Sequence, residues 1–172
     1  MRSPWIPAVT LAALLSAAPA AAQTSDAALT ANVLASLQSY TGLTIFDDVT
    51  VTVIDRTVTL TGKVTMPYKR EDAERRVSRI DGVRHVNNEI DVLPASTTDA
   101  GLRTRVAQAI YSHPAFWQYA SMANPPIHIV VERGRVTLTG CVNNQLERSL
   151  ALALAQVPGA ANVANQLKLD RR

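Results

Sequence analysis

The sequence predicts an α+β fold made of two tandem αββαβ domains, each a three-stranded mixed sheet with two helices on one face. The first observation is an internal repeat, because Val-Thr-Leu-Thr-Gly-Lys-Val at 58–64 returns as Val-Thr-Leu-Thr-Gly-Cys-Val at 136–142, 78 positions later. The second is that helical and alternating apolar patterns follow one another in the same order around both copies. A period of more than 70 residues is too long for a solenoid unit, so the repeat indicates two small domains.

The repeat extends well beyond the shared heptapeptide. Its matching segments are 26–37 with 99–110, 49–53 with 127–131, and 81–92 with 158–169. The offsets are 73, 78 and 77, so the second copy carries five extra residues between its first helix and its first strand. We therefore expect one domain at 24–94, a linker at 95–98 and a second domain at 99–170. Domains of about 70 residues are marginally stable alone, which predicts packing of one copy on the other or on a partner.

The first copy is expected to open with a helix capped by Thr24 or Ser25. Its apolar positions recur every four residues and are Leu29, Val33 and Leu37. Gly42 is expected near the end of this helix. The pattern therefore predicts one amphipathic helix before the first strand.

Two alternating segments, 49–53 and 58–64, predict a hairpin of half-buried strands around a turn at 55–57. Gly62, inside the second strand, indicates a bulge or a close approach of another backbone segment. Threonine and charged side chains occupy the sheet face away from the helices. We expect that face to be the wetter one.

Pro67 is expected to start the second helix, because proline is tolerated at the first helical position. The buried positions of this helix are predicted to be Ala73, Val77 and Ile80. Gly82 is expected at its end, and 86–92 alternates as the third strand. These elements complete the αββαβ order of the first copy.

The second copy repeats the same elements, starting with a helix around 102–110 that Ser96 or Thr98 caps. The later elements are expected at 127–131 and 135–142 for the hairpin, 146–157 for the second helix and 163–169 for the last strand. The second helix is apolar on more than one face, so we expect it to be covered. The first domain is the leading candidate for that cover, and a homo-oligomer contact is the next.

The segment 1–22 is predicted to be a secretory signal peptide. It holds a single charge at Arg2, a short apolar run at 6–15 and small residues before Gln23. We expect cleavage near Ala22 and a periplasmic location, with an uncleaved N-terminal anchor as the alternative. No later segment approaches 18 unbroken apolar residues, so membrane contact is expected to be peripheral rather than transmembrane.

The two copies differ in charge. Residues 24–94 carry eight Lys or Arg and ten Asp or Glu, a net charge of −2, whereas 99–172 carry eight against four, a net charge of +4. The basic character of the chain therefore belongs to the second copy. Export argues against a nucleic-acid partner and leaves an anionic membrane surface open. A single cysteine, Cys141, allows no internal disulfide.

The duplicated unit resembles the BON domain family, named from bacterial osmotically induced and nodulation proteins. The resemblance rests on the two heptapeptides and on the pattern Gly-Val-x-x-Val-x-Asn at 82–88, which the second copy repeats with Ala160 in place of valine. It implies a non-enzymatic bacterial envelope protein that associates with phospholipid surfaces. Structural roles are expected for the glycines and asparagines of these motifs, which are Gly62, Gly82, Asn88, Gly140, Gly159 and Asn165.

Motifs for catalysis and metal binding are missing from the sequence. His85, His113 and His128 share no metal-ligand spacing, and no cysteine or carboxylate cluster joins them. Neither a glycine-rich phosphate loop nor a nucleophile elbow occurs. We therefore expect no enzymatic activity, no metal and no cofactor.

The insertion of the second copy is rich in aromatic residues. It holds Tyr111, Phe116, Trp117 and Tyr119, with Met122 following. Nearby prolines predict a loop or a short helical turn. Two interpretations stay open. The rings either close over the core of a small domain or form an exposed surface for lipid headgroups or a protein partner.

Four arginines of the second copy are expected to form a basic patch at the end opposite the insertion, and they are Arg103, Arg105, Arg133 and Arg135. A helix that runs back along its strand brings its start beside the hairpin turn. Each cation contributes on the order of 1 kcal/mol at an anionic surface, and independently solvated arginines are the alternative.

The leading hypothesis is an envelope protein that associates with anionic phospholipid through the second domain, using these arginines with Phe116, Trp117 and Tyr119. The competing hypothesis is a protein-interaction or chaperone-like module that uses the aromatic loop 111–122.

Overall fold

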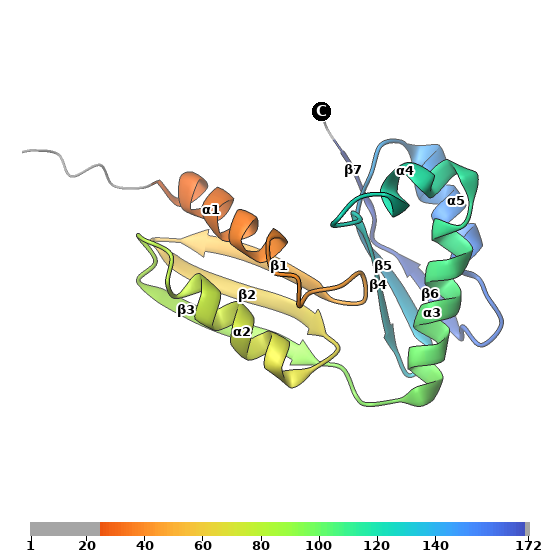
Figure 1. Cartoon of the computed structure of the whole chain (residues 1–172), viewed down its shortest axis with the longest axis horizontal. Helices are drawn as coiled ribbons and strands as arrows, with labels where there is room; N and C mark the ends of the chain where they lie inside the picture. Colours follow the sequence, from red (N-terminus) through yellow and green to blue (C-terminus); the bar gives the residue numbers. More distant parts are fainter. Residues whose placement is uncertain (1–24, 171–172) are drawn as a thin grey trace, which may run out of the picture.

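Two αββαβ units follow one another in the computed structural model, which describes residues 25–170 and confirms the predicted α+β class (Figure 1). The predicted signal peptide lies outside the described residues. The first unit contains α1 (Asp26–Gln38), β1 (Asp48–Ile54), β2 (Thr57–Val64), α2 (Pro67–Val77) and β3 (His85–Val92). The second contains α3 (Thr97–Tyr111), η1 (Pro114–Phe116), α4 (Trp117–Ala120), β4 (Ile127–Glu132), β5 (Arg135–Val142), α5 (Gln145–Ala155), β6 (Asn162–Asn165) and β7 (Lys168–Leu169).

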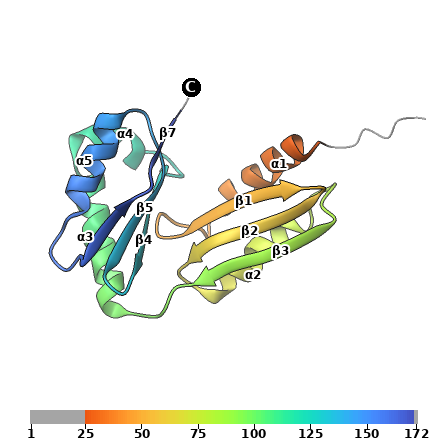
Figure 2. The same ribbon diagram turned by 180° about the vertical axis from the view of Figure 1, so that it is seen from behind.

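The two sheets share one strand arrangement. In the first sheet the central strand β2 pairs antiparallel with β1 and parallel with β3. In the second sheet β5 pairs antiparallel with β4 and parallel with β6. Parallel pairing requires a crossover connection, and α2 and α5 supply it. The two views show the helices of each unit on one face of its sheet (Figures 1 and 2).

The third strand of the second sheet is divided, although the sequence predicts one strand at 163–169. β6 ends at Asn165 and β7 begins at Lys168, yet both pair with β5. The Gln166 N–H donates to the Leu138 carbonyl oxygen at 2.8 Å, so the chain keeps its course between the two segments. The division is therefore a local interruption of the ladder and leaves the topology unchanged.

Each unit has its own core between sheet and helices. Ser25 and Ser96, each one of two predicted caps, accept a hydrogen bond from the first turns of α1 and α3. The predicted positions Leu29, Val33 and Leu37 are buried in the first core. The second core is formed by its counterparts Leu102, Val106 and Ile110 with the inner side chains of β4 and β5.

One predicted helix end is wrong. α2 ends at Val77, several residues before Gly82, whereas α1 ends at Gln38, close to Gly42 as expected. Gly82 adopts a φ of 97° in the turn that leads into β3, where a side chain would be strained. The glycine therefore serves the turn after the helix and not the helix end itself.

Gly62 in β2 and Gly140 in β5 are equivalent residues. Each lies opposite the first residues of the neighbouring antiparallel strand, β1 or β4. Both have positive φ values, 118° and 100°. A Cβ atom on Gly62 would lie 2.1 Å from the Asp48 carbonyl oxygen, and one on Gly140 would lie 1.8 Å from that of Pro126. The predicted close backbone approach is therefore present in both copies, and only glycine fits there.

An aspartate in the first turn of the first helix clamps the hairpin turn of each unit. Asp26 accepts hydrogen bonds from the N–H groups of Asp55 and Arg56 at 2.8 and 3.1 Å. Asp99 does the same for Arg133 and Gly134 at 2.8 and 2.9 Å. The turn residues have positive φ, so the carboxylate satisfies donors that the tight turn leaves without partners.

We expect Asp99→Ala to lower the free energy of unfolding by about 1–2 kcal/mol, because two partly buried N–H groups lose their acceptor. Urea unfolding followed by circular dichroism measures the change. Glu89→Ala is the matched control, since Glu89 is an exposed carboxylate on β3. Equal stability of the Asp99 variant and the wild type would contradict the clamp.

The first domain packs against β4 and not against α5. The prediction that it covers the second helix of the second copy is wrong, since α5 packs on α3 and on its own sheet, with Ala151 and Ala155 buried. Figure 2 shows the loop before β1 reaching β4, on the sheet side away from α5. The expected wet face of the second sheet is therefore partly covered by the first domain.

Candidate functional site

Three backbone groups on the outer edge of β4 have hydrogen-bond partners from three different elements. The Ile129 N–H donates to the Ile45 carbonyl oxygen of the first domain at 2.7 Å. The Tyr111 hydroxyl donates to the Ile127 carbonyl oxygen at 2.6 Å, and Arg103 donates to that of Val131 at 2.8 Å. One main-chain and two side-chain groups thus replace the strand that would otherwise pair there.

Arg103 is therefore not part of a surface patch, contrary to its expected place. It is 8% exposed, and burial lowers its pKa, against the opposing charges of Asp99 and Asp47. Its guanidinium group is held at the β4 edge. Tyr111 donates its hydroxyl proton to the same edge, at Ile127, and burial raises the pKa of this hydroxyl above its ordinary value.

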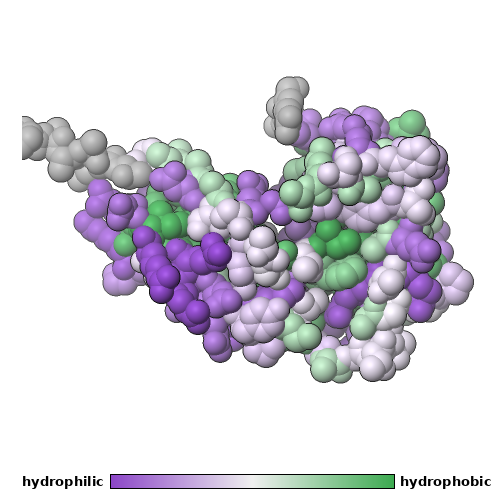
Figure 3. All heavy atoms as spheres, viewed as in Figure 1, coloured by the Kyte–Doolittle hydropathy of each residue, from purple (hydrophilic) through white to green (hydrophobic). Residues whose placement is uncertain are grey.

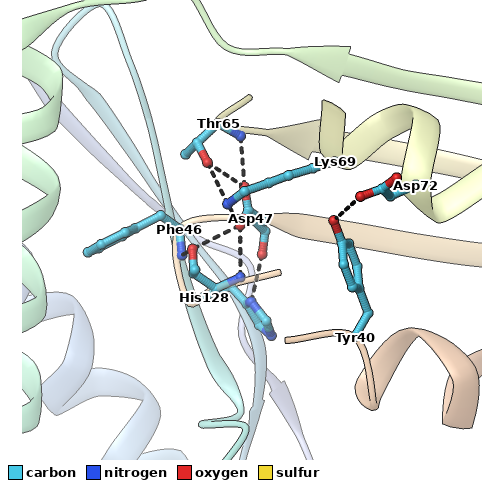
Figure 4. Close-up of polar contacts among 8 residues, drawn as sticks. Tyr40, Phe46, Asp47, Thr65, Lys69, Asp72 and His128 are labelled. Atoms are coloured by element: carbon cyan, nitrogen blue, oxygen red, sulfur yellow. Dashed lines mark hydrogen bonds and ion pairs between the residues drawn. The ribbon is translucent and has the colours of Figure 1, made fainter. Parts of the chain in front are cut away.

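A buried polar cluster centred on Asp47 joins the first core to the domain interface (Figure 4). Lys69, from the first turn of α2, donates to the Asp47 carboxylate at 2.6 Å, and both side chains are almost fully buried. Thr44 and Thr65 donate to it through backbone N–H and hydroxyl groups at 2.7–2.8 Å. Burial acts to raise the Asp47 pKa, but these hydrogen bonds outweigh it and hold the pKa below its ordinary value.

The same segment contacts the second domain directly. The Nδ1 atom of His128 lies 2.7 Å from the Asp47 carbonyl oxygen, which can only accept, so Nδ1 carries the proton. Phe46 packs against the core of the second domain, pointing away from the carboxylate cluster (Figure 4). Asn124 adds a hydrogen bond to the Gln38 carbonyl oxygen at 2.7 Å. The loop before β1 is thus the main tether between the domains.

An equivalent cluster in the second domain uses different residues. Glu147 stands at the position of Lys69 and accepts a hydrogen bond from the Tyr119 hydroxyl at 2.6 Å. The Asn143 N–H, equivalent to that of Thr65, donates to both groups at 3.1 and 3.0 Å. Burial, followed by the bond to Glu147, raises the Tyr119 pKa to about 12. The carboxylate therefore sits on the helix here, whereas in the first domain it sits on the loop.

The aromatic insertion fits both predicted interpretations, because some of its rings are buried and one is exposed. Phe116 and Tyr119 are buried and close over the second core. Trp117 lies between them in sequence and is 61% exposed. Its Nε1–H donates to the Ser112 carbonyl oxygen at 3.1 Å, so the exposed part of the indole is hydrocarbon. Only Trp117 of the three predicted aromatic contact residues is therefore open to a partner.

Further exposed apolar side chains lie at the same end of the second domain. Leu146, at the start of α5, is 77% exposed, and Met122 follows α4. Leu169 pairs with Val142 at the end of β5, beside the exposed Lys168. We call the four exposed apolar residues Trp117, Met122, Leu146 and Leu169 the distal cap. By contrast, hydrophilic residues gather over α2 in the first domain (Figure 3).

The remaining arginines lie at the other end of the second domain. Arg105, Arg133 and Arg135 are exposed around the start of α3 and the hairpin turn that Asp99 clamps. The eight residues of β5 separate this end from the distal cap by about 25 Å, at about 3.3 Å per residue. The two sets of residues therefore do not form one surface.

The motif asparagines bind helix backbone. Asn88 donates to the Arg70 carbonyl oxygen of α2 at 2.9 Å, and Asn165 donates to the equivalent oxygen of Arg148 in α5 at 2.7 Å. Each also accepts from the N–H two residues ahead. These contacts fix the second helix to the third strand in both copies.

Comparison with protein families gives a match to the BON domain over 25–94 and again over 98–171, one match for each unit. The chain belongs to the BON domain family. Within residues 25–170, no helix combines the length and apolar character that crossing a bilayer demands. The same residues contain no group of three or more His, Cys, Asp or Glu side chains placed to hold a metal ion.

No curated protein matches the sequence. Among solved structures it is similar to the C-terminal domain of CdsD, the structural protein of the type III secretion system of Chlamydia trachomatis, at 13% identity and a TM-score of 0.32. That match covers 71% of this chain and 57% of that chain. A second CdsD structure matches at 12% identity and a TM-score of 0.28, covering 81% and 94%. Likenesses this slight carry no functional argument.

Proposed function

We propose that this protein is a non-enzymatic, exported envelope protein that attaches peripherally to anionic phospholipid through its second domain. The observation that carries the proposal is the exposed indole of Trp117, whose polar N–H is already bonded within the protein. Tryptophan in this state favours the headgroup layer of a bilayer, where its hydrocarbon surface leaves water. Membership of the BON family and the predicted signal peptide support the envelope location.

The distal cap is the end that we propose to enter the lipid. It combines Trp117 and Leu146 with Met122 and Leu169, and Lys168 adds a positive charge beside them. The net charge of +4 over 99–172 supplies long-range attraction to an anionic surface. The arginine end faces away from a flat bilayer in this orientation, so it supplies attraction but no insertion.

Titration with vesicles tests this proposal on the protein that begins at Gln23, in which Trp117 is the only tryptophan. We expect a blue shift of Trp117 emission with phosphatidylglycerol vesicles, none with phosphatidylcholine vesicles, and reversal by salt. Leu146→Ser is expected to weaken co-sedimentation about tenfold, because a tenfold change corresponds to about 1.4 kcal/mol of lost apolar contact.

Ile54→Ser is the matched control, since Ile54 is 64% exposed but lies on the hairpin of the first domain. Equal weakening by both substitutions would contradict the distal cap. Absence of both the blue shift and co-sedimentation would exclude phospholipid attachment and favour a protein partner for Trp117.

A further inference from the structure

A polar groove lies where the open face of the second sheet meets the end of the first sheet. It has a volume of about 520 Å³, within the about 300–1,000 Å³ typical of small-molecule sites. Figure 2 shows that β1 begins and β2 ends on the side that faces the second domain. The groove is lined by Lys63 from β2, Arg133 and Arg135 from the hairpin, and Thr137, Thr139 and Gln166 from the second sheet.

The groove carries one more cationic than anionic side chain. Lys63 forms an ion pair with Glu132 across the domain interface, and the hydrogen bond from Lys63 lowers the Glu132 pKa. Arg133 and Arg135 make no ion pair with any residue of 25–170. Asp48 also lines the groove, so three cations face two carboxylates. One positive charge is left over for a ligand.

The basic pair is specific to the second copy of the repeat. Asp55 and Thr57 stand at the equivalent positions of the first copy. The first hairpin is closed by the same kind of aspartate clamp, and the charge of its Arg56 is balanced by the neighbouring Asp55, so no net positive charge gathers there. Since the clamp needs only backbone N–H groups, the fold gives no reason for the two arginines.

Hydroxyl and amide groups extend from the arginine end along the groove. Arg135, Thr137 and Thr139 alternate on the open face of β5, so neighbours are about 7 Å apart. Gln166 lies beside them. The Thr139 Oγ1 atom is buried and has no hydrogen-bond partner among the described residues. Because the Oγ1 atom is buried, it contacts a ligand in the groove only from another staggered χ1 rotamer.

We infer that this groove binds a phosphorylated sugar or polyol, with the phosphate at Arg133 and Arg135 and the hydroxyl groups against Thr137, Thr139 and Gln166. Guanidinium groups bind phosphate oxygens with paired, charge-assisted hydrogen bonds. The neutral row suits a hydroxylated body, because each threonine and the glutamine both donate and accept. The site is separate from the distal cap and goes beyond attachment to lipid.

Amide chemical shifts of the full exported protein test the inference with glucose 6-phosphate as the probe. We expect glucose 6-phosphate to cause saturable shifts in 135–139 and at Gln166. Inorganic phosphate should bind about tenfold more weakly because it lacks the sugar contacts, and glucose should not bind because it lacks the phosphate contacts. Arg135→Gln is expected to weaken glucose 6-phosphate binding about tenfold. Arg105→Gln, an exposed arginine at the same end but outside the lining, is the matched control.

Thr139→Val separates binding from folding. Valine keeps the shape of threonine and removes a hydroxyl that has no partner, so stability is expected to be equal or higher while affinity falls about threefold. Absence of saturable shifts with glucose 6-phosphate, or equal weakening by Arg105→Gln and Arg135→Gln, would overturn the inference.

Vesicles distinguish the source of the phosphate. Weaker attachment of Arg135→Gln than of Arg105→Gln to phosphatidylglycerol vesicles identifies a lipid headgroup as the natural ligand, because both variants lose the same long-range attraction. Equal attachment of the two variants identifies a soluble ligand. A Trp117→Ser variant that loses vesicle attachment but keeps glucose 6-phosphate shifts shows that the groove and the distal cap are independent. Failure of one proposal is therefore distinguishable from failure of the other.

Discussion

Lys69→Met is expected to lower the free energy of unfolding by about 3 kcal/mol, measured by urea unfolding with circular dichroism. Among residues 25–170, Lys69 is the only cation that forms an ion pair with the Asp47 carboxylate, and the substitution leaves that carboxylate buried. Four hydrogen bonds from Thr44 and Thr65 remain, which keeps the loss near the lower end for broken buried ion pairs. Because Asp47 also holds the loop that contacts His128, we expect weaker domain contact as well.

The double variant Asp47→Asn/Lys69→Met is the control for this prediction. Removing both charges leaves no uncompensated ion, so its loss is expected to be smaller than the sum of the single losses. Additive losses would contradict the coupling of Asp47 with Lys69.

The effect of Lys69→Met is expected to depend on pH. The folded Asp47 pKa lies below the unfolded one, so the folded state binds its proton less readily and stability rises with pH between the two values. This contribution is complete above about pH 4 and is lost as the pH falls through the folded pKa. The difference between wild type and variant should therefore narrow below about pH 4. A difference that stays constant down to about pH 2 would contradict this account.

Gly140→Ala is expected to lower the free energy of unfolding of the second domain by about 3–5 kcal/mol, through backbone strain and a steric clash. The φ of 100° is unfavourable for alanine, and the Cβ atom would lie 1.8 Å from the Pro126 carbonyl oxygen. Relief requires movement of the start of β4, whose outer edge contacts the first domain. Amide hydrogen exchange measures the loss separately in each domain.

Gly101→Ala is the matched control for the glycine prediction. Gly101 lies in α3, where a Cβ atom meets only the end of the Arg105 side chain at 3.4 Å. Alanine favours the helix by about 1 kcal/mol, so this substitution should stabilise the protein. Loss of stability in both variants would show that the chain tolerates no change at glycine and would remove the argument from Gly140.

The sequence predicted the architecture because a repeat carries the same information twice. The paired heptapeptides and the spacing of Leu29, Val33 and Leu37 indicate strands and helices by local pattern alone. The predicted end of α2 was less accurate, since Gly82 serves a later turn. The division of the last strand into β6 and β7 could not be predicted, because the apolar alternation continues across it.

The candidate site was harder to predict because it depends on contacts between distant segments. The sequence predicts Arg103 to be a surface cation. In the structure it is buried because it donates to the Val131 carbonyl oxygen of β4, and only the packing of α3 against β4 brings these groups together. Asp47 and Lys69 are 22 residues apart without any motif. The match of Asp26 with Asp99 was the one available signal for the hairpin clamps. Exposure of Trp117 between two buried rings is equally invisible in the sequence.

The contact of the first domain with the outer edge of β4 protects that edge from pairing with another chain. A bare strand margin templates cross-chain β pairing, domain swapping and amyloid growth. Arg103 and Tyr111 protect part of this margin from within the second domain, but the Ile129 N–H is covered by the loop of its neighbour. We therefore expect the second BON domain alone to aggregate more readily than the tandem protein, because separating the copies exposes this N–H group.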